Sequence, residues 1–177
     1  KRVQESFGKN PNLIFNFHMT EDEAEIVEYA YNIPHITLEG KATWALGIVT
    51  GNNNKYISNS PQDGYIPILK GADITKEGFK NPSNYIQSDF SKFQQVAPLH
   101  LYNAKEKVAY RFINSDLVFA YDNEQRYFLN SANIFILNES INISHEQITF
   151  LLNTKFINWI FRNIFRRIEQ SISLLKE

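Results

Sequence analysis

The pattern of apolar and polar positions first becomes regular near residue 20, where it predicts a helix from about Glu21 to Asn32. Thr20 and Glu23 have the spacing of a capping box, in which two side chains satisfy free N–H groups at the start of a helix. Apolar residues follow every three or four positions, and Pro34 ends the pattern. The helix is expected to be acidic, because "TEDEAEIVE" supplies its first turns.

Beyond this helix the pattern changes to short apolar runs separated by turn residues, which is typical of β-strands. The runs "KVAYRFIN" (107–114), "LVFAYD" (117–122) and "NIFILNESINI" (133–143) predict a meander with strands about eight to twelve residues apart. Further short strands are expected within "HITL" (35–38), "ATWALGIVT" (42–50), "KYIS" (55–58) and Tyr85-Ile86. The middle of the chain is therefore expected to form a sheet.

Near the C-terminus the spacing becomes helical again. Ser144 is expected to cap a helix through "HEQITFLLN" (145–153), and "KFINWIFRNIFRRIEQSISLL" (155–175) continues that helix or begins a second one. An apolar stripe recurs every four residues, at Ile148, Leu152, Phe156, Ile160, Ile164, Ile168 and Ile172. Together these patterns predict an α+β fold: a curved, mostly antiparallel or mixed β-sheet core with an acidic N-terminal helix and C-terminal helices. Residues 1–40 would form an N-terminal extension, and residues 41–177 the main domain.

The composition is that of a folded domain. Of 177 residues, 43% are hydrophobic and 21% are charged, a balance typical of globular proteins. The absence of cysteine excludes disulfides and thiolate chemistry, and it fits an intracellular, cytoplasmic protein. No apolar run approaches the roughly 18 residues that cross a membrane, so no membrane partner is expected. The opening "KRVQESFGKNPN" has neither an initiating Met nor a signal-peptide core, and we interpret the chain as a segment of a longer protein.

The net charge of −1 argues against strong general affinity for nucleic acid, but the charges are unevenly distributed. Residues 1–40 contain three Lys or Arg and seven Asp or Glu, whereas residues 41–177 contain fifteen and twelve. A mildly basic body joined to an acidic helix permits local contact with a polyanion.

The segment "LGIVTGNNNKYI" (46–57) places a glycine, three asparagines and a lysine between two apolar runs. These residues favour a hairpin turn, for which Gly51 would supply a positive φ angle. Alternatively, the turn displays amides and an ammonium group that bind a partner. The stretches "LKGADITK" (69–76) and "KEKVAYR" (105–111) also place Lys or Arg beside Thr or Tyr, although solvated turns and strand edges share this composition. Composition and spacing alone leave both interpretations open.

Catalytic motifs and metal sites are not evident in the sequence. The four histidines are scattered, with no pair at ligand spacing: His18, His35, His100 and His145. There is no nucleophile elbow and no phosphate-binding glycine loop, since Gly71 follows rather than precedes Lys70. Glu39 and Lys41 match half of a metal-dependent nuclease motif, a pattern that is common by chance. We therefore assign no catalytic residue and no metal ligand.

Three stretches, in this order, resemble the TaqI-like C-terminal specificity domain of restriction–modification DNA methyltransferases. They are "LGIVTGNNNKYI" (46–57), "YIPILKGADI" (65–74) and "KEKVAYRFINSDLVFAYDNEQRYFLNSANIFIL" (105–137). The following "ITFLLNTKFINWIF" (148–161) is similar to the helix that this family carries after its sheet, with "LNTK" (152–155) in place of a Leu-Asn-Ser-Lys-type turn. The resemblance covers approximately residues 40–165, whereas residues 1–35 show no similarity to this family.

The resemblance implies a target-recognition domain that reads a short sequence of double-stranded DNA. A separate catalytic domain, upstream in the same polypeptide, would transfer a methyl group from S-adenosylmethionine to adenine, with or without a fused endonuclease. The family's signature Asn-Pro-Pro-Tyr is absent, the nearest string being "NPSN" (81–84), and a glycine-rich cofactor loop is also missing. This segment is therefore expected to bind no cofactor and to catalyse nothing by itself.

Under this resemblance the residues expected to contact DNA are Thr50, Gly51, Asn52, Asn53, Asn54, Lys55, Lys70, Lys107 and Arg111. Asparagine can pair with adenine, whereas lysine and arginine can contact guanine or phosphate. Alternatively, Arg111 forms an ion pair with Glu106 or Asp122 inside the domain.

Two other functions compete with DNA recognition. The apolar C-terminal helices could dock on a partner protein, which would make the domain a non-catalytic scaffold. The residues expected in that contact are Phe156, Trp159, Ile160 and Phe161. The second alternative is a nuclease that uses Glu39 and Lys41. The helix cations Arg162, Arg166 and Arg167 lie off the apolar stripe, where they would contact phosphate, the catalytic domain or only water, with water as the default expectation.

Overall fold

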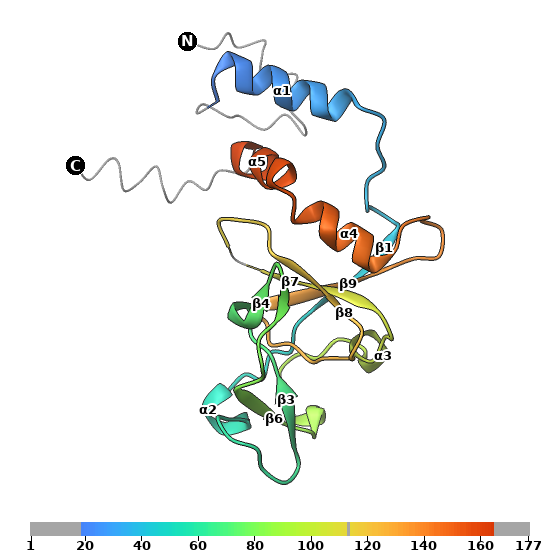
Figure 1. The fold of residues 1–177 in the computed structure, drawn as a ribbon. Helices are drawn as coiled ribbons and strands as arrows, with labels where there is room; N and C mark the ends of the chain where they lie inside the picture. The colour runs from blue at the N-terminus through green and yellow to red at the C-terminus, as the bar shows by residue number, and fades with distance from the viewer. Residues whose placement is uncertain (1–18, 113, 165–177) are drawn as a thin grey trace, which may run out of the picture. The chain divides into compact units, whose positions relative to one another are not determined.

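A computed structural model describes residues 19–112 and 114–164 (Figure 1). The chain divides into two compact units. Leu38–Thr154 form the central unit, and Lys1–Thr37 together with Lys155–Glu177 form the terminal unit. The sequence-based division into residues 1–40 and 41–177 stays a prediction.

The central unit contains a four-stranded antiparallel sheet with the strand order β1-β9-β7-β8 (Figure 1). β1 spans Ala42–Leu46 and pairs with β9 (Ala132–Leu137), which pairs in turn with β7 (Lys107–Arg111). β8 (Phe119–Asp122) lies on the other side of β7. These strands confirm those predicted from the alternating segments, and together with the helices they confirm the α+β fold class. The predicted meander is wrong, because β9 pairs with β7 and not with β8.

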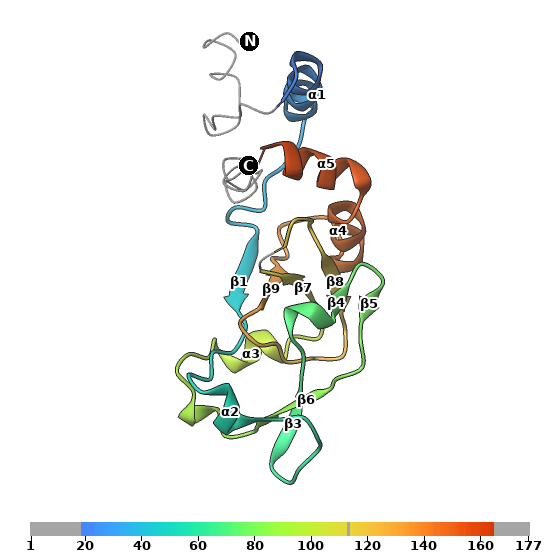
Figure 2. The ribbon, with the colours of Figure 1, turned by 90° about the vertical axis from the view of Figure 1, so that its left-hand side faces the viewer.

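Two smaller antiparallel sheets and several single helical turns complete the central unit. The strands of the first sheet, in the order β2-β6-β3, span Ile57–Ser58, Asn84–Gln87 and Tyr65–Ile68. Those of the second, β4 and β5, span Ile74–Thr75 and Gly78–Phe79. The helical turns are α2 (Asn53–Tyr56), η3 (Gly71–Asp73), η4 (Phe90–Lys92) and α3 (Leu99–Tyr102). Figures 1 and 2 show α2, β3 and β6 at the end of the unit that lies away from α4.

Hydrophobic side chains cover both faces of the four-stranded sheet. On one face, Ala109 and Ile134 belong to a large core that continues toward the smaller sheets. On the other face, Val108 and Phe135 pack against Ile148 of the helix that follows the sheet. Because both faces of the sheet are covered, the residues of β7 do not alternate between buried and exposed positions.

The C-terminal helix of the central unit, α4 (His145–Leu152), is capped by Ser144 as predicted and is tied to the sheet at its other end. The Asn153 side chain pairs with the backbone of Phe119 as a neighbouring strand would. Its Oδ1 accepts the Phe119 N–H at 3.0 Å, and its Nδ2 donates to the Phe119 carbonyl at 2.8 Å. The chain turns here, so α5 (Lys155–Ile164) begins a second helix rather than continuing the first.

We expect His145, at the start of α4, to make the stability of the central unit sensitive to acid. Its Nε2 accepts the Leu137 N–H at 3.0 Å, so the neutral ring carries its proton on Nδ1, which lies 3.6 Å from Glu106 Oε2. Burial lowers the pKa of His145 from its ordinary value of 6.5, while the Glu106 carboxylate acts in the opposite direction. A protonated ring would direct a second N–H at the Leu137 N–H.

We expect this residue to leave the free energy of unfolding unchanged above pH 6.5 and to lower it as the pH falls further, because the unfolded chain binds the proton more readily. Loss of the hydrogen bond corresponds to about 1 kcal/mol. Urea unfolding at about pH 7.5 and about pH 5 measures the effect. The variant His145→Gln keeps an acceptor that does not titrate and should lose this part of the pH dependence. An unchanged pH dependence in that variant contradicts the prediction.

In the terminal unit, α1 spans Glu21–Asn32 and begins at the predicted capping box. The Thr20 N–H donates to Glu23 Oε2 at 2.8 Å, and the Glu23 N–H donates to the Thr20 hydroxyl at 3.2 Å. Val27 of α1 packs with Ile164 of α5 in a small core. No helix among residues 19–112 and 114–164 is long and apolar enough to cross a membrane.

Two local predictions are wrong. The segment 35–38 forms no strand, and residues 35–37 are exposed without a neighbouring strand in the described part of the chain. The segment 51–55 is not a hairpin turn, because it leads into the helical turn α2. Residues 165–175 of the predicted C-terminal helix lie outside the described residues, and they include Arg166, Arg167, Ile168 and Ile172.

Candidate nucleic-acid interface

A short backbone stretch between β8 and β9, Tyr127–Asn130, organises the candidate site, and we call it the bridging segment. One edge of this segment exchanges two backbone hydrogen bonds with Ile48, at 2.7 and 3.1 Å. Its other edge exchanges two with Leu69, at 3.0 and 2.9 Å. The loops that follow Ile48 and Leu69 are thereby anchored to the same segment, although about twenty residues separate them in the sequence.

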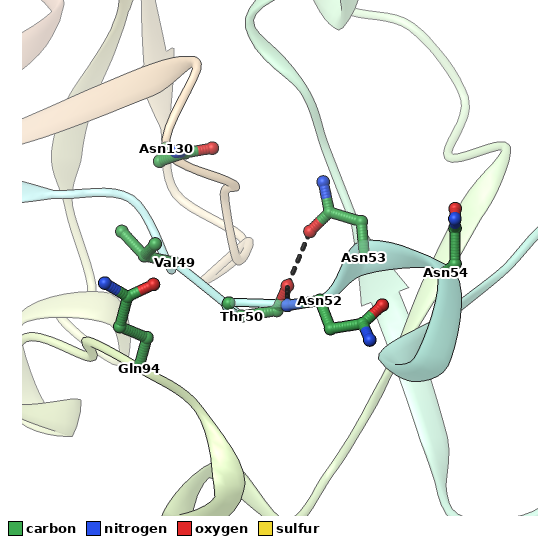
Figure 3. Close-up of a pocket in the computed structure, with 8 residues that line it drawn as sticks. Val49, Thr50, Asn52, Asn53, Asn54, Gln94 and Asn130 are labelled. Carbon is green, nitrogen blue, oxygen red and sulfur yellow. Dashed lines mark hydrogen bonds between the residues drawn. The ribbon is translucent and has the colours of Figure 1, made fainter.

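The first loop, residues 50–55, is held in shape by its own polar groups (Figure 3). Gly51 turns the chain with a φ angle of +78°, which residues with a side chain rarely adopt. The buried Thr50 hydroxyl accepts the Asn52 N–H at 3.1 Å and donates to Asn53 Oδ1 at 2.6 Å. Asn52 Oδ1 accepts the backbone N–H three residues later, at 3.2 Å, and so caps α2.

Because of these hydrogen bonds, the three asparagines differ in which side-chain atoms remain for contact with a partner. The Oδ1 atoms of Asn52 and Asn53 are engaged within the loop, and their Nδ2 groups make no hydrogen bond to a residue of 19–112 or 114–164. Asn54 is exposed, and its side chain makes no hydrogen bond to any described residue. In Figure 3 it points away from Thr50. Bidentate pairing with adenine needs both the oxygen and the nitrogen of an amide, and Asn54 is the asparagine of this loop that keeps both.

A hollow of about 390 Å³ opens beside this loop, and we call it the amide hollow. Its lining residues are Val49, Thr50, Gly51, Asn52, Asn53, Asn54, Gln94 and Asn130. Gln94 and Asn130 come from two other segments and are exposed (Figure 3). Like Asn54, they make no side-chain hydrogen bond within the described part of the chain. Three segments therefore contribute free amide groups to one depression.

A second hollow, of about 450 Å³, shares Asn130 with the first, and we call it the arginine hollow. Its lining residues are Gly71, Ala72, Arg111, Phe112, Asn130 and Ser131. Because Asn130 lines both hollows, the two depressions adjoin at the end of the bridging segment.

Backbone contacts to Ser131 hold the arginine hollow together. The Gly71 N–H donates to Ser131 Oγ at 2.8 Å, and a Cβ on Gly71 would lie 2.3 Å from the Ser131 carbonyl oxygen. Only glycine permits this approach. The same carbonyl accepts the Phe112 N–H at 3.1 Å. The loop after Leu69 and the end of β7 are therefore both fixed to Ser131.

Arg111 lies at the end of β7 and is oriented by the carbonyl of Ile74. Its Nε and Nη2 donate to that oxygen at 2.9 and 2.7 Å. A guanidinium group has five N–H donors, so three are left for a partner. The alternative that Arg111 pairs with Glu106 or Asp122 is wrong, since no ion pair joins them among the described residues.

Lys55 and Lys70 are the lysines of the two loops, and both are exposed. Lys55 Nζ lies 5.1 Å from the centre of the Tyr56 ring, a cation–π distance. Lys70 immediately precedes Gly71 of the arginine hollow. The structure thus brings Thr50 to Lys55, Lys70 and Arg111 to one connected region of the central unit.

Lys107 is not part of this region, and its expected contact with DNA is corrected. The side chain is fully buried, and its Nζ donates to Asp122 at 2.6 Å and to the Tyr102 carbonyl at 2.7 Å. Burial lowers the pKa of the Lys107 ammonium group, while the hydrogen bond and the charge of Asp122 act to raise it. Arg126 contacts the same carboxylate at 2.9 Å. Lys107 is therefore one member of a buried ion-pair cluster.

Seven lining residues were not among the expected DNA contacts: Val49, Gly71, Ala72, Gln94, Phe112, Asn130 and Ser131. The string "FLNSAN" (128–133) did contain a signal, since Asn and Ser between two apolar runs indicate a turn. The string does not indicate which loops contact that turn. Those contacts depend on the backbone pairing of residues 127–130 with Ile48 and Leu69.

Among residues 19–112 and 114–164, no group of three His, Asp or Glu could hold a metal ion. His35 and His100 are exposed, and His145 accepts a backbone hydrogen bond. His18 lies outside the described residues.

Free amides and an oriented arginine thus line two adjoining hollows of the central unit, and exposed lysines lie on the loops beside them. Residues 66–177, more than half of the chain, match the family described as the TaqI-like C-terminal specificity domain. The chain belongs to this family, and the resemblance seen in the sequence is confirmed.

A curated relative extends this comparison. The type II methyltransferase M.VspI of Vibrio sp. (strain 343) is 53% identical to this chain over 75 residues. The match covers 42% of this chain and 18% of that protein. The chain thus spans less than a fifth of the length of the curated relative that it matches.

Proposed function

We propose that this chain is the sequence-specific DNA-recognition domain of a type II-like restriction–modification methyltransferase that acts on adenine. It holds double-stranded DNA while a catalytic domain of the same polypeptide methylates a flipped adenine with S-adenosylmethionine. The observation that carries the proposal is the meeting of two hollows at Asn130, with free amides in one and an oriented arginine in the other. Membership in a specificity-domain family supports the same function.

The surface contains both kinds of group that a reader of DNA needs. Lysine and arginine contacts to phosphate fix the orientation of the duplex, and amide contacts to base edges choose the sequence, at about 1–3 kcal/mol for each bidentate pair. Lys55 and Lys70 are exposed at the two loops, while Asn54, Gln94 and Asn130 carry unengaged amides.

A separate recognition domain suits the chemistry of adenine methylation. An enzyme that modifies a base must extrude it from the stack, which costs a few kcal/mol. Contacts that a second domain makes with the rest of the duplex offset this cost and set the register of the target. We assign no cofactor to this chain, and S-adenosylmethionine belongs to the catalytic domain.

The test is binding of the 177-residue chain to random-sequence duplexes, measured by fluorescence anisotropy over a range of salt concentrations. We expect the logarithm of the binding constant to fall linearly with the logarithm of the salt concentration, with a slope of about −0.9 for each phosphate contact. Sequence selection from the same pool should then recover a preferred site. A chain that binds no duplex at low salt would refute the proposal.

Asn54 and Asn52 are expected to respond differently to replacement by alanine. Asn54→Ala should weaken binding to the preferred site by about 1–3 kcal/mol and leave random-sequence binding and the melting temperature unchanged. Asn52→Ala should lower the free energy of unfolding by about 1 kcal/mol, because it removes the cap of α2. Anisotropy and thermal unfolding of both variants check this prediction. Equal losses of stability in the two variants contradict it.

A protein-contact function has one observation in its favour. Phe150 and Leu151 of α4 are 77% and 46% exposed. We propose that these apolar side chains contact the catalytic domain, with the scaffold function as the alternative. If the wild-type chain binds no duplex at low salt, the scaffold function is favoured.

A further inference from the structure

We propose that the arginine hollow receives the 5-methyl group of a thymine, with Phe112 and Ala72 as the residues that contact it. The inference rests on the proposed function, because it assumes that this surface meets the major groove of a duplex. It adds two specificity-determining residues that the sequence did not indicate.

The observation behind the proposal is an apolar pair within a polar surface. Phe112 is 55% exposed, Ala72 is also exposed, and both line the arginine hollow. Their neighbours in the hollow are Arg111, Asn130 and Ser131. Covering water-exposed apolar surface with a partner lowers the free energy of the system. Burying an apolar group of matching size on that partner lowers it further.

The backbone presents this pair in a fixed position. The Phe112 N–H donates to the Ser131 carbonyl at 3.1 Å, and Ala72 follows Gly71, whose N–H donates to the Ser131 hydroxyl at 2.8 Å. Both apolar residues are thus anchored to one residue from two different loops. A backbone that is already anchored loses less conformational freedom on binding than an unanchored loop, which favours a specific contact.

The chemistry of the base edges selects thymine. In the major groove, thymine carries an apolar methyl group beside its acceptor, and alanine and phenylalanine are among the side chains that contact it. Arg111 lines the same hollow with three N–H donors unused by Ile74, so it can hold the polyanion against the apolar pair. Phosphate binding alone would require Arg111 and would leave Phe112 and Ala72 without a role.

Substitution of single methyl groups tests this contact. Duplexes bound by the 177-residue chain are selected from a random pool, and each thymidine of the selected site is replaced in turn by deoxyuridine, which lacks the methyl group. We expect one replacement to weaken binding about three- to fivefold, the effect of leaving one methyl group unburied. Phe112→Ala should weaken binding to the unmodified duplex by a similar factor and lose the difference between thymidine and deoxyuridine.

Two further variants separate this contact from general effects. Phe112→Leu keeps an apolar side chain and should retain part of the difference, which also provides a readout if the alanine variant unfolds. Tyr29→Ala removes an exposed ring that lines neither hollow and should bind as the wild type does.

The possible failures are distinguishable. Equal binding of every deoxyuridine duplex by the wild type overturns the methyl contact alone, because DNA recognition is then still observed. A uniform loss of affinity in Phe112→Ala, with the thymidine preference unchanged, overturns it as well and indicates stacking on a base. Absence of binding to any duplex overturns both this inference and the proposed function.

Discussion

Replacement of Lys107 by alanine is expected to lower the free energy of unfolding by about 3–5 kcal/mol, the usual cost of removing one partner from a buried ion pair. Lys107 and Asp122 are both fully buried, and their charged groups lie 2.6 Å apart. Without the ammonium group, Asp122 keeps Arg126 as a partner, while the Tyr102 carbonyl loses its hydrogen bond. Urea unfolding followed by circular dichroism measures the change.

Two control variants show whether charge or volume is responsible for that loss. Lys107→Met preserves most of the side-chain volume and should be nearly as destabilised, because Asp122 and the Tyr102 carbonyl still lose the ammonium group that they share. Lys70→Ala removes an exposed lysine and should change stability by no more than about 0.5 kcal/mol. A loss in Lys107→Ala as small as that in Lys70→Ala would show that the buried pair does not stabilise the fold.

Simultaneous replacement of Lys55 and Lys70 by alanine is expected to weaken binding to random-sequence DNA on the order of a hundredfold at about 50 mM salt. Each phosphate contact contributes about 0.9 to the slope of binding against salt, so the slope should become shallower by about 1.8. Both lysines are exposed, so stability should stay as in the wild type. Anisotropy titrations over a salt series provide the slope and the affinity together.

The matched control for this double variant is Lys105→Ala with Lys155→Ala. These two lysines are also exposed, and neither lines a hollow or adjoins one in the sequence. The control changes the net charge by the same amount, so it reports the effect of charge without the proposed contacts. If both double variants show the same slope, the proposed phosphate contacts of Lys55 and Lys70 are refuted.

The features predicted correctly from the sequence have local causes. The capping box of Thr20 and Glu23 acts within one helical turn, and Ser144 likewise caps a helix from its own neighbourhood. The alternation between residues 107 and 137 is also local, and it yields three strands of the four-stranded sheet. Such signals do not depend on which distant segment lies opposite.

Lys107 shows why the candidate site was only partly predictable. In a sheet with one solvated face, a lysine that alternates with Val108 and Tyr110 would point to water. Here a second core covers that face, and Asp122, fifteen residues away in the sequence, neutralises the ammonium group. Local alternation carries no information about a second layer.

Asn52 illustrates a competition between two local signals. Gly51 followed by three asparagines favours a hairpin, but an asparagine is also one of the preferred N-cap residues of a helix. The buried Thr50 hydroxyl decides between them, because it accepts the Asn52 N–H and holds the loop in the capped form. The burial of Thr50 depends on tertiary packing that this stretch of sequence does not reveal.

The anchoring of the bridging segment has a consequence for engineering and for divergence within the family. Ile48 and Leu69 are joined to it through main-chain groups, so substitutions of Asn54, Gln94 or Ala72 leave those attachments in place. Other side chains can therefore be introduced at these positions without changing the backbone contacts of the bridging segment. A library randomised at these three positions should therefore contain folded members that differ in the duplexes they prefer.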